Sequence, residues 1–154
     1  MKKILSLLII GFGILFDQLV KNWVVQNIAF GTVKKFIPGI MSLTRLTNSG
    51  AAWSMLEGQQ WLFNILTPIA IVVALYFLWK KQEQIPYNIA LSLIISGALG
   101  NWIDRIRQGF VVDMFQTDFI NFAIFNVADA LLSIGFVLLI LSILFDKDEK
   151  PEAN

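Results

Sequence analysis

The most constraining feature of this 154-residue sequence is a set of four apolar segments, at approximately 4–25, 61–79, 85–105 and 121–145. Each is close to the ~20 residues that a helix needs to cross a hydrocarbon core of ~30 Å. Only 15% of the residues are charged, whereas a soluble domain has about 25%. The sequence therefore predicts an α-helical integral membrane protein with four transmembrane helices, forming a single membrane domain over residues 1–154.

The segments between these helices predict the parts that lie outside the membrane. Residues 28–60 contain short apolar stretches broken by glycine and proline, which indicates a small β-rich cap. Residues 106–120 are expected to form an outer loop. An even number of spans places both termini on one side, and Lys2 and Lys3 before the first helix favour the cytoplasm. No signal-peptide cleavage pattern follows the first helix promptly, so we expect it to be retained.

The composition excludes several kinds of chemistry. The sequence has no cysteine and no histidine, which removes disulfides, thiol nucleophiles, zinc sites built on those ligands, and Ser-His-Asp triads. A net charge of +1 gives no basic excess for binding nucleic acid. Any reaction must use carboxylates, Lys, Ser, Thr, Tyr or Asn. We expect no metal, no cofactor and no nucleic-acid partner.

Several polar residues fall inside the predicted helices, where an ionisable group costs about 2.5–3.5 kcal/mol and needs a partner or a purpose. Asp17 and Lys21 are four residues apart on the first helix and can pair on one face. Two interpretations remain open: Asp17 and Lys21 form a structural ion pair, or they help to hold a functional site in place. On the third helix Asn101, Asp104 and Arg105 share a face, and they are either a snorkelling cluster with an Asp–Arg pair or part of a site.

The start of the fourth helix is the most informative region. Asn126 and Asp129 are three residues apart there, and Asp129 has no basic neighbour within a helical turn. Asp113 lies between apolar residues in the outer loop just before this helix. Two carboxylates can therefore meet at one membrane surface, where a shared proton makes one an acid and the other a base.

Three function classes are compatible with these residues. An acid–base carboxylate pair can activate water to cleave an amide. A pair of intramembrane carboxylates can also carry protons or ions in a small transporter. The third class is a Ser-Lys peptidase using Ser49 or Ser54 with Lys34 or Lys35, although these lysines lie in a segment with exposed character and a catalytic lysine needs burial.

Five motifs give the sequence a resemblance to one family. They are FDQLVK, TNSGAAWS, GALGNWIDR, GFVVDM and FNVADA. In this order and at these spacings the sequence resembles the bacterial lipoprotein signal peptidases, or type II signal peptidases, a family of membrane aspartyl endopeptidases. The resemblance covers nearly the whole chain and favours a peptidase over a transporter.

The resemblance implies an endopeptidase that removes the signal peptide from diacylglyceryl-modified prolipoproteins, on the N-terminal side of the lipidated cysteine. It implies Asp113 and Asp129 as the catalytic dyad. It also implies substrate-binding or site-supporting roles for Asn48, Gly50, Asn101, Asp104, Arg105, Asn126, Asp17 and Lys21.

The resemblance further implies a β-rich extracytoplasmic cradle, which agrees with the cap expected at 28–60. We expect a monomer in the bacterial cytoplasmic membrane, with both termini cytoplasmic and the active site toward the extracytoplasmic face. Its expected partners are the lipidated prolipoprotein and membrane lipid.

Overall fold

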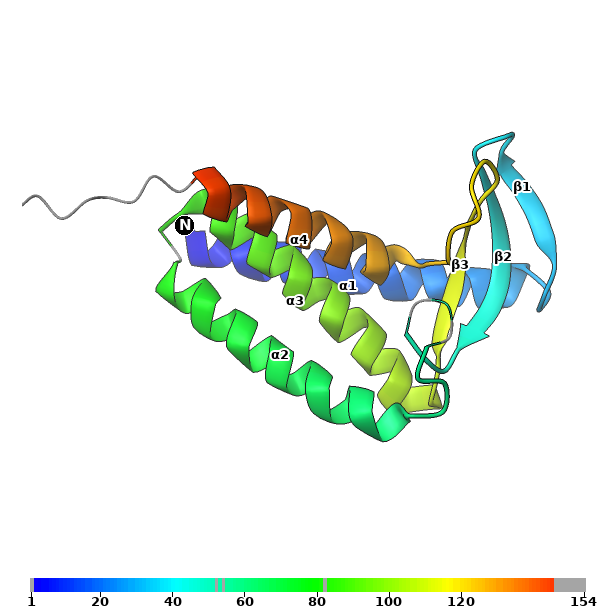
Figure 1. Cartoon of the computed structure of the whole chain (residues 1–154), viewed down its shortest axis with the longest axis horizontal. Helices are drawn as coiled ribbons and strands as arrows, with labels where there is room; N and C mark the ends of the chain where they lie inside the picture. The colour runs from blue at the N-terminus through cyan, green and yellow to red at the C-terminus, as the bar shows by residue number, and fades with distance from the viewer. Residues whose placement is uncertain (1, 52, 54, 82, 146–154) are drawn as a thin grey trace, which may run out of the picture.

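A computed structural model describes residues 2–51, 53, 55–81 and 83–145 of the chain. Its elements in order are α1 (Lys2–Asn27), β1 (Val33–Ile37), β2 (Met41–Asn48), α2 (Gln60–Lys80), α3 (Ile85–Gln108), β3 (Val111–Thr117) and α4 (Val127–Phe145). The helices run alongside one another, and the strands lie together at the end of the bundle opposite the N-terminus (Figure 1). This arrangement confirms the predicted four-helix membrane fold with a small β-rich part.

The four helices are each long and apolar enough to cross a membrane. Their apolar side chains mostly point outward, including Leu7, Val72 and Leu144, which are 65–71% exposed. Such a surface is stable only against lipid. The exception is α3, which is largely buried because it packs against α1, α2 and α4.

Glycine lets α3 and α4 approach closely. A side chain at Gly97 would collide with the backbone of α4 at Leu132, and one at Gly135 would come within 2.9 Å of the Ala90 carbonyl oxygen on α3. Small residues at membrane helix contacts allow this kind of backbone packing. The contact fixes the position of α4 against the centre of the bundle.

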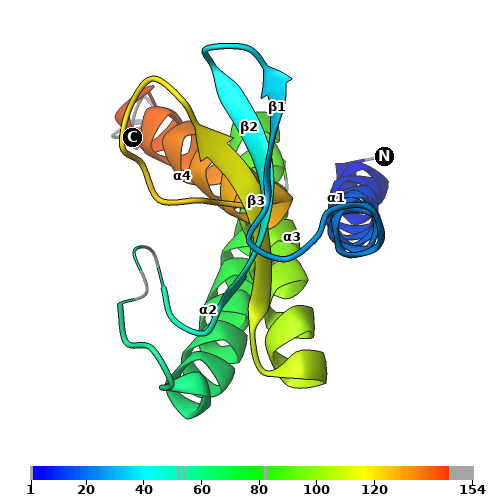
Figure 2. The ribbon, with the colours of Figure 1, turned by 90° about the vertical axis from the view of Figure 1, so that its right-hand side faces the viewer.

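The sheet is antiparallel, with β2 between β1 and β3. Figure 2 looks onto this end of the molecule and shows the sheet in front of α3, with α1 on one side and α4 on the other. The cap expected at 28–60 supplies β1 and β2. The third strand comes from residues expected to form a loop, and its pairing places Asn48 opposite Val111 and Leu46 opposite Asp113.

Two of the expected boundaries were wrong. Residues 106–120 are not simply a loop, because α3 continues to Gln108 and β3 follows after Gly109, a C-cap with a φ of 79°. The fourth helix begins at Val127 rather than at 121. Phe125 exchanges two backbone hydrogen bonds with Phe115 on β3, at 2.8 and 3.1 Å, and this extended pairing prevents an earlier helix start.

Candidate active site

Asp113 projects from the middle of β3 and is 4% exposed. Its Oδ1 accepts a hydrogen bond from Asn126 Nδ2 at 2.7 Å, and its Oδ2 accepts one from Asn48 Nδ2 at 2.9 Å. The pKa of Asp113 is raised to about 6, chiefly by burial; the nearby charge of Asp129 contributes to the rise, and the hydrogen bonds from the two amides oppose it. This carboxyl therefore takes up a proton at a higher pH than an ordinary aspartate does.

Asp129 lies in the first turn of α4, three residues after Asn126. The Asn126 side-chain oxygen accepts a hydrogen bond from Asp129 N–H at 3.0 Å, and Asp129 Oδ2 accepts one from Asn126 N–H at 3.1 Å. This reciprocal pair is a capping box. Asp129 Oδ1 accepts a further hydrogen bond from Asn101 Nδ2 at 2.7 Å. A negative charge is favoured at this end of a helix.

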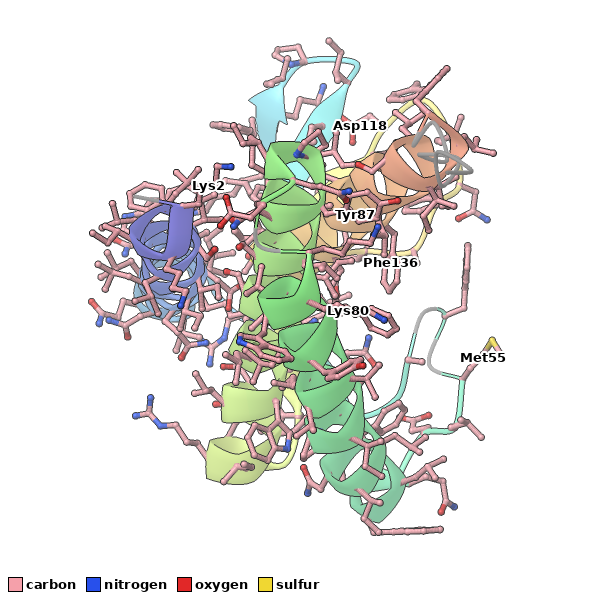
Figure 3. All side chains as sticks on the ribbon, turned by 90° about the vertical axis from the view of Figure 1, so that its left-hand side faces the viewer. Lys2, Met55, Lys80, Tyr87, Asp118 and Phe136 are labelled. Carbon is pink, nitrogen blue, oxygen red and sulfur yellow. The ribbon has the colours of Figure 1, made fainter. Side chains whose placement is uncertain are left out.

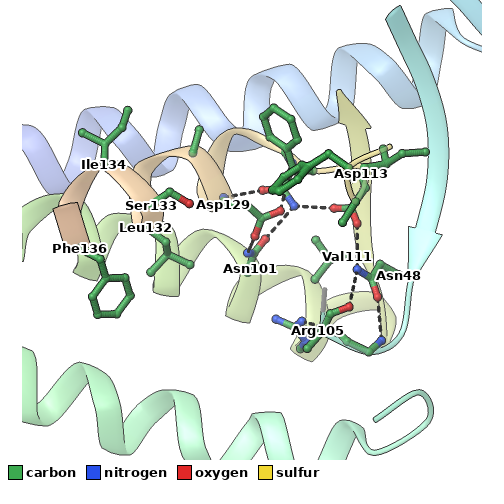
Figure 4. A pocket seen from close by; sticks show the side chains of 18 residues that line it. Asn48, Asn101, Arg105, Val111, Asp113, Asp129, Leu132, Ser133, Ile134 and Phe136 are labelled. Carbon is green, nitrogen blue, oxygen red and sulfur yellow. Dashed lines mark hydrogen bonds between the residues drawn. The ribbon is translucent and has the colours of Figure 1, made fainter. Parts of the chain in front are cut away.

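Asn126 joins the two carboxylates. It is fully buried, and its Nδ2 donates to Asn101 Oδ1 at 3.2 Å as well as to Asp113. One side chain thus binds Asp113 directly and holds Asp129 through the capping box (Figure 4). The structure brings together the two aspartates that the sequence placed at one membrane surface.

Both carboxylates line one end of a cavity of about 650 Å³. Asn48, Asn101, Arg105 and Asn126 are other polar residues near that end. Further along α4 the wall is formed by side chains such as Leu132, Ile134 and Phe136, and Phe136 points from α4 toward the space beside α2 (Figures 3 and 4). The cavity therefore joins a polar end that holds both carboxylates to an apolar part along α4.

Arg105 connects this cavity to the segment after β2. Its Nη2 donates to the Gly50 carbonyl oxygen at 3.0 Å, and its guanidinium lies 4.6 Å from the centre of the Phe63 ring. Gly50 N–H in turn donates to Asn48 Oδ1 at 2.9 Å. The Asp–Arg pair considered from the sequence is wrong, because Asp104 pairs with Lys21 instead.

Asp17, Lys21 and Asp104 form a buried cluster behind the cavity. Lys21 Nζ lies 2.8 Å from Asp17 Oδ2 and 2.8 Å from Asp104 Oδ2. The ion pair expected between Asp17 and Lys21 is therefore present. Gln18 was missed, although it stands inside the FDQLVK motif, and its Nε2 donates to Asp104 Oδ1 at 2.9 Å.

The cluster also reaches α4. Asp17 Oδ1 accepts a hydrogen bond from the Ala128 backbone N–H at 2.9 Å. This N–H is one of the unpaired donors at the start of a helix, which need an acceptor. The first helix therefore holds the turn of α4 that carries Asp129.

The serine and lysine alternatives do not come together in the described part of the chain. Ser49 Oγ donates to Glu57 Oε1 at 3.3 Å, and Lys34 Nζ donates to the Asn27 carbonyl oxygen at 3.1 Å. Lys34 and Lys35 lie on β1, whose residues are all exposed. Ser54 lies outside the described residues.

The chain is similar to proteins of known kind along nearly its full length. The sequence profile of the family described as signal peptidase (SPase) II matches residues 9–145. A lipoprotein signal peptidase of Lactococcus lactis subsp. lactis is 65% identical over 150 residues, covering 97% of this chain and 100% of that protein. One from Enterococcus faecalis is 47% identical over 152 residues, covering 98% and 92%.

Two solved structures, both titled as a bacterial membrane enzyme structure by the in meso method, share the fold. One, at 2.3 Å resolution, has a TM-score of 0.90 and 38% identity, covering 97% of this chain and 93% of that chain. The other, at 1.9 Å resolution, has a TM-score of 0.85 and 39% identity, covering 92% and 94%. With its fold, its sequence motifs and these relatives in agreement, the chain belongs to the signal peptidase II family.

Proposed function

We propose that this protein is an aspartyl endopeptidase that removes the signal peptide from diacylglyceryl-modified prolipoproteins, cleaving on the N-terminal side of the lipidated cysteine. The observation that carries the proposal is the joining of Asp113 and Asp129 by Asn126 at one end of an apolar cavity. Two carboxylates held close together share one proton and divide acid and base roles.

In this proposal Asp113 is the acid and Asp129 is the base. We assign the shared proton to Asp113 because burial raises the pKa of this carboxyl to about 6, above its ordinary value. We assign the base role to Asp129 because its carboxylate accepts two N–H hydrogen bonds at the N-terminus of α4, where a negative charge is favoured.

The reaction then needs only water and the dyad. Asp129 takes a proton from water as the oxygen attacks the scissile carbonyl carbon, and Asp113 donates its proton to the carbonyl oxygen. When the tetrahedral intermediate collapses, the C–N bond breaks and the proton on Asp129 passes to the leaving nitrogen. Asp113 recovers its proton from the hydroxyl of the intermediate. The products are a signal peptide with a new carboxyl group and a lipoprotein with a free cysteine amine.

The lining of the cavity is compatible with a lipidated substrate. Its polar end carries the dyad, whereas side chains of α4 and the segment before it make the rest apolar. An acylated peptide can present its scissile bond to Asp113 and Asp129 while its acyl chains stay in the bilayer. Since both carboxylates and the groups that donate hydrogen bonds to them belong to one chain, we propose that the enzyme acts as a monomer, with the prolipoprotein and membrane lipid as its partners.

We place the enzyme in the bacterial cytoplasmic membrane, with both termini cytoplasmic and the dyad toward the outside. Lys2 and Lys80 lie at the end of the bundle opposite the sheet and the dyad (Figures 1 and 3). Basic residues favour the cytoplasmic side. In this cysteine-free chain, Lys35→Cys in intact cells should react with a membrane-impermeant thiol reagent, and Lys80→Cys should react only after lysis. The reverse labelling pattern would show that the protein has the opposite orientation in the membrane.

The decisive experiment compares Asp113→Asn and Asp129→Asn with the parent on a diacylglyceryl-modified prolipoprotein. Each amide removes the acid or the base, so each variant should lose cleavage by about 10³-fold or more while remaining folded. Asp118→Asn is the matched control, because Asp118 follows β3 and bonds Ser42 outside the cavity. Cleavage by either dyad variant at the rate of Asp118→Asn would reject the mechanism. A chelator should leave the parental rate unchanged.

A further inference from the structure

The ammonium group of Lys21 has more partners than an ion pair requires. It is 3% exposed, its nitrogen lies 2.8 Å from both Asp17 Oδ2 and Asp104 Oδ2, and it donates a hydrogen bond to Asn101 Oδ1 at 3.0 Å. The two carboxylates suffice to balance its charge. The third contact points toward the dyad, through Asn101.

Asn101 is the side chain whose orientation this contact decides. A primary amide can occupy the same space in two orientations that exchange its oxygen and its nitrogen. In the observed orientation Asn101 Oδ1 receives Lys21 Nζ and Asn126 Nδ2, and Asn101 Nδ2 donates to Asp129 Oδ1 at 2.7 Å.

The opposite orientation is unfavourable at every contact. The Asn101 NH₂ group would face the Lys21 ammonium and the Asn126 NH₂ group, and the Asn101 oxygen would face the Asp129 carboxylate. Asn126 could turn its own amide to relieve its share of the conflict, at the expense of the hydrogen bond to Asp113. An ammonium has no acceptor to offer. Lys21 therefore favours the observed direction of the Asn101 amide, as the carboxylate of Asp129 also does.

We propose, resting on the aspartate mechanism above, that Lys21 is a positioning residue: it orients the Asn101 amide so that its N–H holds Asp129 in the geometry of the base. Asp17 and Asp104 fix the ammonium in place, and the Asp17 hydrogen bond to Ala128 N–H ties the same cluster to the first turn of α4. The first helix thus acts on the site of Asp129 through two of its side chains: Lys21 bonds Asn101, and Asp17 bonds the Ala128 N–H.

A charge-matched pair of double variants tests this role. Asp17, Asp104 and Lys21 together carry a charge of −1, and combining Asp104→Asn with Lys21→Met or Lys21→Gln keeps that charge. Met and Gln have similar volumes, but only Gln brings an N–H donor for Asn101. We expect kcat of the Met double variant to be roughly tenfold or more below that of the Gln double variant. KM should agree within about twofold and the unfolding midpoints within about 3 °C.

Each other outcome overturns the proposal. Equal kcat values would show that the donor to Asn101 does not matter. A rate difference that follows KM or the unfolding midpoint, or loss of the folded protein in either double variant, would make Lys21 a structural residue. Asp129→Asn is measured in parallel: if it cleaves at the parental rate, the aspartate mechanism itself fails, whereas an inactive Asp129→Asn with equal double variants rejects only the role of Lys21.

Discussion

Replacing Gly97 with alanine should separate α3 from α4 and displace Asp129, the proposed base. A Cβ at this position would lie 2.8 Å from Leu132 Cγ and 3.0 Å from Leu132 N, and closer still to the Ala128 carbonyl oxygen. Ordinary van der Waals contact begins at 3.4 Å. Two of these neighbours are backbone atoms, which cannot rotate away, so the first two turns of α4 must move.

The size of the effect follows from that collision. Overpacking costs about 1–3 kcal/mol, and the better helix propensity of alanine returns up to about 1 kcal/mol. These terms give a net loss between about 0 and 3 kcal/mol in the free energy of unfolding, and we expect a value near the middle of that range. Asp129 lies one residue after Ala128, and a displacement of about 1 Å in a reacting group costs about 10²-fold in rate.

Gly11→Ala is the matched control, since it introduces the same methyl group into a membrane helix with no atom within 4 Å. Both variants are purified in one detergent, and their cleavage of a diacylglyceryl-modified prolipoprotein and their thermal unfolding are compared. Gly11→Ala should match the parent in rate and be no less stable. If Gly97→Ala cleaves within about twofold of Gly11→Ala, the close packing of α3 and α4 does not position Asp129, and the reasoning is refuted.

Two further predictions concern Asp113 and Arg105. The pKa of Asp113 is about 6 in the folded protein, whereas its ordinary value is 3.8. Between these two pH values the folded protein keeps a proton that the unfolded chain has released. The stability that this proton contributes, roughly 3 kcal/mol, is therefore present below pH ~4 and lost as the pH rises through about 6. Thermal unfolding from pH 4 to 7 should show this fall in the parent and not in Asp113→Asn, and equal slopes would contradict it. Arg105→Lys should lower kcat by about tenfold or more with little change in unfolding midpoint, because lysine lacks the planar, multidentate group with which Arg105 both bonds the Gly50 oxygen and lies over the Phe63 ring. Parental cleavage by Arg105→Lys would assign Arg105 a purely structural role.

Local patterns in the sequence were enough to predict the helices and the meeting of the two aspartates. The four apolar lengths follow from the thickness of a bilayer. Asp129, with no basic residue within a turn, had to find partners from another segment, and it finds Asn101 on α3. These inferences needed only spacing and the cost of charge in lipid.

The contacts that could not be predicted are those between distant segments. Nothing in residues 106–120 alone shows that they pair with β2, because strand pairing depends on what the rest of the chain offers. Asp104 and Arg105 are neighbours in sequence, but consecutive residues on a helix point about 100° apart. Their side chains therefore reach different partners, Lys21 and Gly50. The bond from Ala128 N–H to Asp17 joins positions 111 residues apart.

The length of α4 has a consequence for substrate choice. Asp129 is followed by sixteen uncharged residues up to Phe145, which at 1.5 Å per residue span about 24 Å. The capping box fixes where this span begins, so Asp129 lies that distance from Phe145 along the helix, whereas a hydrocarbon layer is ~30 Å thick. On the proposed function, a bound signal peptide would have to bring its scissile amide to this first turn of α4. We therefore expect cleavage to depend on the length of the apolar segment of the signal peptide as well as on its sequence.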